Sequence, residues 1–128
     1  MFSDRPERTL DGVRWVRLCR SIDVVERRGF RVELDWDHDI ALFRVEGITR
    51  AVSNVCPHKR AAMIYDGFIE NGTIQCPLHG WTYNICTGEP LIGASKLTVY
   101  AVVEEGGWIW LNISDAEHSD RVLMAAQR

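Results

Sequence analysis

Pairs of turn-forming residues divide this chain into short segments with the alternating polarity of β-strands. The pairs are Glu46-Gly47 between residues 39–45 and 48–55, Asn71-Gly72 within residues 67–76, and Gly106-Gly107 within residues 96–113. Asn-Gly tolerates the positive φ angles of a type I′ hairpin turn, which joins neighbouring antiparallel strands. Short strands joined by tight turns predict an all-β fold, namely a small antiparallel β-sandwich or barrel.

The remaining segments add strands and offer little helix. Residues 14–18 and 31–36 also have the composition and alternation of strands. Asp37-His38-Asp39 resembles an acid–base cluster, but a solvated turn between two strands is the simpler interpretation. Residues 23–28 favour a single helical turn.

Length and composition indicate one domain over residues 1–128. The chain has 128 residues, and 46% of them are hydrophobic, which is enough for one independent core. We expect that core to span about residues 13–113. Residues 114–128 form a polar tail that begins with a capping-box pattern, Ser114 to Glu117.

Charge and hydropathy exclude two classes of partner. The 15 basic residues are outnumbered by 18 acidic ones, so the chain lacks the positive field that nucleic-acid binding requires. No apolar run approaches the roughly 20 residues that span a bilayer, and the N-terminus has no apolar leader. We therefore expect a cytoplasmic protein with neither nucleic acid nor membrane as a partner. In that compartment its four cysteines are expected to be thiols or metal ligands.

Two loops each carry one cysteine and one histidine. Cys56 and His58 stand two apart, Cys76 and His79 stand three apart, and residues 59–75 separate the pairs. Thiolate and imidazole are the ligands that transition metals prefer. The expected hairpin around Asn71-Gly72 would return the chain and bring both loops face to face.

The four candidate ligands are compatible with two kinds of metal centre. Zinc binds Cys2His2 sets, but such sites usually take both cysteines from one knuckle and both histidines from a helix. In this chain each loop carries one cysteine and one histidine, and no helix is expected nearby. A diiron cluster in which the cysteines bind one iron and the histidines the other is the alternative.

The doubled motif resembles the Rieske 2Fe-2S family. The resemblance is carried by CPH at residues 56–58, CPLHGW at residues 76–81 and the later Thr87-Gly88. It implies one Rieske-type 2Fe-2S cluster in a Rieske-type fold with a two-loop cluster-binding subdomain. The implied ligands are Cys56 and Cys76 through Sγ on one iron, and His58 and His79 through Nδ1 on the other.

The same resemblance assigns roles to five neighbours of the ligands. Pro57 and Pro77 would stiffen the loops by fixing φ, and Gly80 would leave room beside the cluster. Trp81 stands where respiratory relatives have a serine that donates a hydrogen bond to a sulfide, so its presence implies a lower potential. Tyr83 matches a tyrosine whose hydroxyl reaches a ligand sulfur, which would raise the potential slightly.

Two further departures concern disulfides and charge. Respiratory relatives clamp the cluster with a disulfide, but Ala61 and Leu78 occupy the matching positions, so no clamp can form here. Lys59 and Arg60 adjoin His58 and would form a cationic rim that steers an acidic redox partner, although ordinary surface charge explains them equally well. Of the other cysteines, Cys86 is expected to be a reduced thiol packed under a loop, and Cys19 suggests no role.

The resemblance implies a one-electron carrier rather than an enzyme. The expected ferredoxin would pass electrons from a flavin-dependent reductase to a terminal oxygenase, as one component of a dioxygenase system. An alternative is the Rieske-like small subunit of NAD(P)H nitrite reductase, whose partner is the reductase large subunit. A second alternative is a structural zinc module that uses the same four ligands to bind a partner protein.

Overall fold

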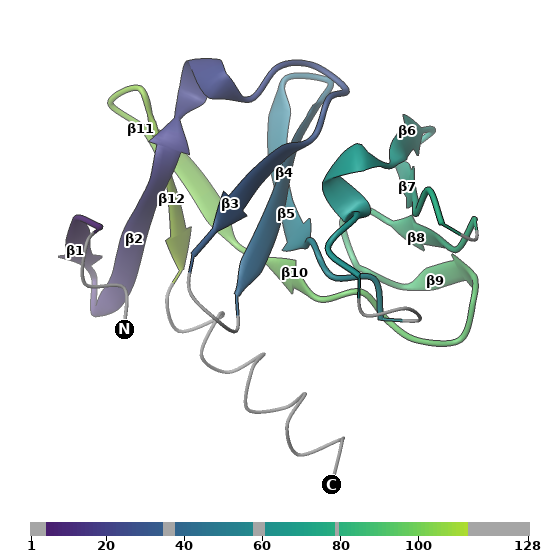
Figure 1. The fold of residues 1–128 in the computed structure, drawn as a ribbon. Helices are drawn as coiled ribbons and strands as arrows, with labels where there is room; N and C mark the ends of the chain where they lie inside the picture. Colours follow the sequence, from purple (N-terminus) through teal and green to yellow (C-terminus); the bar gives the residue numbers. More distant parts are fainter. Residues whose placement is uncertain (1–4, 35–37, 58–60, 79, 113–128) are drawn as a thin grey trace, which may run out of the picture.

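The computed structural model describes residues 5–34, 38–57, 61–78 and 80–112, and it arranges them in three antiparallel sheets (Figure 1). The all-β prediction is therefore confirmed. No helix in the described part of the chain is long and apolar enough to cross a membrane. The extent of the single domain stays a prediction, and the capping box from Ser114 to Glu117 lies outside the described residues.

The strands fall into three four-stranded sheets. The first has the order β1-β2-β12-β11, with β1 (Glu7–Leu10), β2 (Val13–Arg20), β12 (Trp108–Asn112) and β11 (Val102–Glu105). The second has the order β10-β5-β4-β3, with β10 (Val99–Tyr100), β5 (Ile48–Ser53), β4 (Asp39–Val45) and β3 (Phe30–Glu33). The third has the order β6-β7-β8-β9, with β6 (Phe68–Glu70), β7 (Thr73–Gln75), β8 (Thr82–Asn84) and β9 (Pro90–Ile92).

The expected hairpins form at the expected turns. φ is 49° at Asn71 and 75° at Gly72, so the pair closes β6 onto β7 in the left-handed region that asparagine and glycine tolerate. Glu46-Gly47 and Gly106-Gly107 close their own hairpins with positive φ angles as well. A further turn, Asp11-Gly12, was not expected; it creates β1 by pairing it with β2.

The expectation of a helical turn over residues 23–28 is wrong. The only turn of helix near there is a 3-10 turn, η1 (Ser21–Asp23), and Glu26 instead bridges to Arg44 of β4. The side chain of Arg44 explains the difference. Its guanidinium donates to the carbonyls of Ser21 (2.9 Å) and Val24 (2.8 Å), which a continued helix would have needed as its own acceptors.

His38 lies, as expected, in the connection between two antiparallel strands, β3 and β4, but the expectation that it is solvated is wrong. His38 is only 4% exposed, and its carbonyl accepts a hydrogen bond from the backbone amide of Leu34 at 2.8 Å. Asp39 begins β4, and its carboxylate pairs with Arg31 at 2.7 Å. The strand pairing therefore starts one residue after His38 and draws this residue inward, while residues 35–37 lie outside the described residues.

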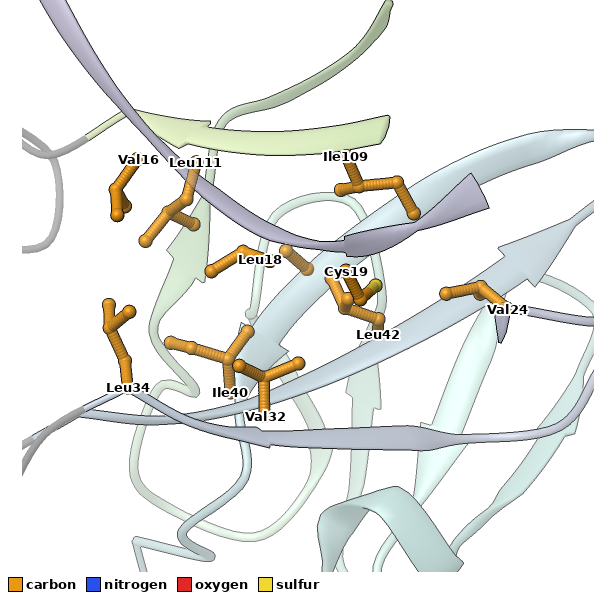
Figure 2. Packing of buried hydrophobic residues seen from close by; sticks show 11 residues of the cluster. Val16, Leu18, Cys19, Val24, Val32, Leu34, Ile40, Leu42, Ile109 and Leu111 are labelled. Carbon is orange, nitrogen blue, oxygen red and sulfur yellow. The ribbon is translucent and has the colours of Figure 1, made fainter. Parts of the chain in front are cut away.

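Two cores lie on opposite sides of the second sheet. The first core fills the space between the first and second sheets, where side chains of β2 and β12 face those of β3 and β4 (Figure 2). The second core lies between the second and third sheets and includes Ile69, Ile74 and Tyr83. β4 supplies both cores, because Ile40 and Leu42 face the first and Ala41 and Phe43 face the second.

An ion-pair network fastens the first sheet to the second. The Arg44 guanidinium donates to both carboxylate oxygens of Glu104 on β11, at 2.9 and 3.2 Å, and the Thr49 hydroxyl also donates to Glu104. The hydrogen bond from Arg44 is the main reason that the pKa of Glu104 lies below its ordinary value. The charged form of Glu104 therefore stabilises the fold.

Replacing Glu104 by glutamine should make the protein less stable at neutral pH, by about 1–2 kcal/mol, because a charge-assisted bidentate contact is lost. A lowered pKa in the folded state contributes stability above the unfolded pKa, and that stability disappears as pH falls through the folded pKa. The difference between wild type and Glu104→Gln should thus shrink below about pH 4.5, the ordinary value for Glu104. Denaturant unfolding at several pH values measures it.

Glu33→Gln is the matched control, since Glu33 has a 69% exposed side chain and pairs with Arg31 only at the surface. Its unfolding free energy should stay within about 0.5 kcal/mol of wild type at every pH. A Glu104→Gln variant as stable as this control at pH 7 would show that the network adds no stability.

Candidate metal centre

Cys56 and Cys76 are buried together in the second core. Each is 1% exposed, and both belong to the cluster that includes Ile74 and Tyr83. Cys56 follows β5 after two residues, and Cys76 follows directly after β7. The second and third sheets thus each deliver one cysteine to a shared apolar interior.

Each cysteine loop is closed by a main-chain hydrogen bond, and the two bonds are equivalent. The amide of Cys56 donates to the carbonyl of Ala61 at 2.9 Å, and the amide of Cys76 donates to the carbonyl of Trp81 at 2.8 Å. In each loop the acceptor lies five residues after the cysteine. The second loop has an additional bond, from the amide of Gly80 to the carbonyl of Cys76 at 3.1 Å, which the positive φ of Gly80 (74°) permits.

Asn54 anchors the start of the first loop through hydrogen bonds. It is fully buried; its side-chain amide donates to Asp39 at 3.0 Å, and its side-chain oxygen accepts the amide of Tyr65 at 2.7 Å. Its backbone carbonyl accepts the amide of Ile64 at 3.1 Å. Sequence reasoning missed this residue. The available signal was a lone asparagine two residues before the first cysteine, at the end of a strand.

The Tyr83 hydroxyl lies 3.9 Å from the Sγ atom of Cys56. This is the contact that the resemblance implied. Tyr83 is fully buried, and burial, followed by the proximity of Cys56, raises the pKa of its hydroxyl well above the ordinary value of 10. The phenol therefore stays protonated and can donate its hydrogen to the sulfur.

Trp81 packs against the segment after β9. A Cβ atom on Gly93 would lie 2.4 Å from Cε3 of the indole, so only glycine allows this approach. The ring also packs, partly buried, against the second core. Trp81 thus lies against the chain at Gly93. Pro57, Pro77 and Gly80 are partly exposed in the two loops.

The two histidines and the cationic pair lie outside the described residues. These positions are 58–60 and 79, so the prediction that His58, His79, Lys59 and Arg60 belong to the site stays a prediction. Among the residues that the structure describes, no three metal-binding side chains come together. What is described fits the cysteine half of a cluster, because two buried thiols on two closed loops share one apolar interior.

The other two cysteines do not belong to the site. Cys19 lies in the first core, where burial is the main cause that raises the pKa of its thiol to about 12. Cys86 is exposed, which contradicts the expectation of a thiol packed under a loop. Asn84 explains its position: the side-chain oxygen of Asn84 accepts the amides of Cys86 (2.8 Å) and Thr87 (3.1 Å) and turns the chain there.

Comparison with known proteins decides the family. The family model described as the Rieske [2Fe-2S] domain matches residues 14–99, more than half of the chain. The chain belongs to the Rieske [2Fe-2S] family. The matched range spans the positions of all four predicted ligands, and the family implies a 2Fe-2S cluster for this Rieske protein rather than the zinc of the alternative.

Individual relatives are similar over most of their own length. The chain is 31% identical over 104 residues to the ferredoxin component of the naphthalene 1,2-dioxygenase system of Pseudomonas putida, covering 80% of this chain and 98% of that protein. A chain of a structure titled as the complex of reduced oxygenase and oxidized ferredoxin in carbazole 1,9a-dioxygenase superposes with a TM-score of 0.70. It is 27% identical, with 77% of this chain and 92% of that chain covered.

A third relative comes from a different system. The structure described as a putative NADH-dependent nitrite reductase small subunit from Mycobacterium tuberculosis has a TM-score of 0.69 and 27% identity. The match covers 76% of this chain and 92% of that chain. Both types of carrier that the sequence suggested therefore occur among the structural neighbours of this Rieske protein.

Replacing Tyr83 by phenylalanine should lower the midpoint potential of the cluster, because the hydroxyl near Cys56 stabilises the more negative, reduced state. Loss of a hydrogen bond of ~0.5–1.4 kcal/mol corresponds to roughly 20–60 mV for a one-electron couple. Redox titration followed by circular dichroism or electron paramagnetic resonance measures the change. Tyr65→Phe, in a tyrosine that packs against the same core, is the control and should leave the potential unchanged. Equal midpoints for Tyr83→Phe and wild type would contradict this role.

Proposed function

We propose that this chain is a one-electron carrier, the ferredoxin component of a multicomponent dioxygenase system. The observation that supports this most is the coverage: the match extends over 98% of a dioxygenase ferredoxin component, so the similarity concerns a whole carrier of this kind. The chain itself would not be a catalyst. Its donor would be a flavin-dependent reductase and its acceptor a terminal oxygenase.

The proposed ligands are Cys56 and Cys76 on one iron and His58 and His79 on the other. When bound, such a cluster accepts and releases one electron. The residues of the chain provide the surroundings: the apolar second core surrounds the two cysteines, and the hydroxyl of Tyr83 lies where it can donate a hydrogen bond to the Sγ atom of Cys56. Lys59 and Arg60, next to His58, are proposed to steer an acidic surface of a partner.

The cytoplasm is the proposed location. Cys19 and Cys86 are free thiols, and Cys86 is exposed, which fits a reducing compartment. A cytoplasmic carrier of this kind would meet its reductase and oxygenase by diffusion and would bind each of them only transiently.

A second candidate is the small subunit of an NADH-dependent nitrite reductase. Structural similarity to one such protein supports it, with a TM-score of 0.69 close to the 0.70 of the dioxygenase structure. In that case the acceptor would be a siroheme-containing large subunit. Sequence similarity to whole dioxygenase ferredoxins favours the first candidate.

The ligand assignment predicts the metal content of two cysteine variants. Wild type should contain iron and acid-labile sulfide and, after reduction with dithionite, give a rhombic electron paramagnetic resonance signal of the mixed cysteine–histidine type. Cys76→Ser should lower the iron and sulfide content by about tenfold or more, because a ligand is lost. Cys86→Ser, at an exposed cysteine, should retain both. A zinc-containing wild type without sulfide would refute the cluster.

The choice between the two functions predicts which acceptor oxidises the reduced protein. Dithionite-reduced protein is mixed with terminal oxygenases, including that of the naphthalene 1,2-dioxygenase system, and separately with a siroheme nitrite reductase large subunit. Recovery of the visible absorption of the oxidised cluster is followed by stopped flow. We expect oxidation by at least one oxygenase and not by the nitrite reductase. The reverse result would assign the chain to the nitrite reductase system.

A further inference from the structure

The outer face of the third sheet exposes a group of large apolar side chains. Phe68 is 64% exposed, Leu91 60% and Ile92 58%, and all three line one hollow of about 490 Å³. Monomeric proteins normally scatter such residues singly, and a gathered patch usually marks a contact surface. Leu78, 42% exposed, adds an apolar side chain on the second cysteine loop itself.

Strand register aligns the centre of this surface in a single row. Phe68 pairs with Gln75, Gln75 with Thr82, and Thr82 with Ile92, so the row crosses β6, β7, β8 and β9. Side chains on directly paired residues lie on the same face of a sheet. The neighbouring Ile69 and Ile74 point the other way, into the second core. The row is therefore apolar at both ends and polar but uncharged in the middle; we call Phe68, Gln75, Thr82 and Ile92 the outer row.

The outer row is bonded to the second cysteine loop. The side-chain amide of Gln75 donates to the carbonyl of Gly80 at 3.4 Å, and the hydroxyl of Thr82 donates to the same carbonyl at 3.0 Å. Gln75 directly precedes Cys76, and Thr82 directly follows Trp81. A protein that covers the outer row is consequently placed beside the loop that holds the proposed ligand Cys76.

The lining of the hollow includes one charged residue, Glu70. The remaining lining residues are apolar or neutral, so an oppositely charged partner would gain little by binding there. Three or four exposed side chains are also too few for a stable dimer, because stable interfaces bury roughly 1,200–2,000 Å², whereas weak redox encounters bury less. The size and chemistry of the surface fit a transient complex with a partner protein that offers an uncharged, apolar patch.

We infer that the outer row, with Leu78 and Leu91, is the docking surface for an apolar patch of the terminal oxygenase. This inference rests on the proposed function. The oxygenase is the chosen occupant because a matching structure is a complex of an oxygenase with a ferredoxin. Docking here lets the electron leave beside the second cysteine loop, and the affinity that this surface contributes comes from apolar contact.

The test uses a Phe68→Ser/Ile92→Ser double variant and the oxygenase that wild type reduces fastest. Binding is measured by sedimentation or interferometry, and electron transfer by stopped flow, at low and high salt. The double variant should bind about tenfold more weakly and transfer electrons correspondingly more slowly, while its iron content and resonance signal stay those of wild type. Raising the salt concentration should change the affinity of wild type and of the double variant by the same factor, because the two substitutions remove no charge.

Ile48→Ser is the matched control, since Ile48 is 52% exposed but lies on β5, in the second sheet. It should bind and transfer as wild type does. Wild-type behaviour of the double variant, an equal loss in Ile48→Ser, or a loss confined to the reaction with the reductase would overturn the docking surface while leaving the carrier function intact. If wild type reduces no oxygenase, the proposed function is wrong, and so is the inference that an oxygenase binds this surface.

Discussion

Burial of β4 on both faces is the constraint on which the rest of the structure depends. Ile40 and Leu42 face the first core while Ala41 and Phe43 face the second, so this strand joins the two halves of the molecule (Figures 1 and 2). Because protein cores are closely packed, a change in β4 would affect the packing on both of its sides. β4 therefore supports the second core, which holds Cys56 and Cys76, as well as the first core.

The link between the halves continues along the segment that precedes β3. The Arg27 guanidinium donates to the carbonyl of Ile69 on β6 at 2.9 Å, and a Cβ atom on Gly29 would lie 1.8 Å from the carbonyl oxygen of Tyr65. Backbone approaches of this kind leave no space for a side chain. Together with the second core, they fix the third sheet, and with it Cys76, against the second sheet and Cys56.

Sequence reasoning recovered the strands that alternate over several residues and the hairpins with strong turn pairs, such as Asn71-Gly72. It did not recover β8 and β9, because strands of three residues carry too little periodicity. It missed the burial of His38, where Leu34 bonds the backbone carbonyl. It also wrongly predicted a helical turn over residues 23–28, where a distant partner, Arg44, takes the carbonyls that a helix would use. For the site, spacing alone found the cysteines, but Asn54 and the outer row emerge only from tertiary packing and strand register.

Both cysteine loops are closed by main-chain atoms. The hydrogen bonds that hold the cysteines in place therefore do not depend on the side chains at the loop surface. The amides of Cys56 and Cys76 are held by carbonyl groups, which every residue possesses, whatever side chain it carries. Substitutions between each cysteine and its acceptor therefore leave this closure available, except at Gly80, whose positive φ favours glycine. During evolution, such carriers can therefore change the charge and shape of the cysteine loops in small steps and acquire new partners while the fold stays the same.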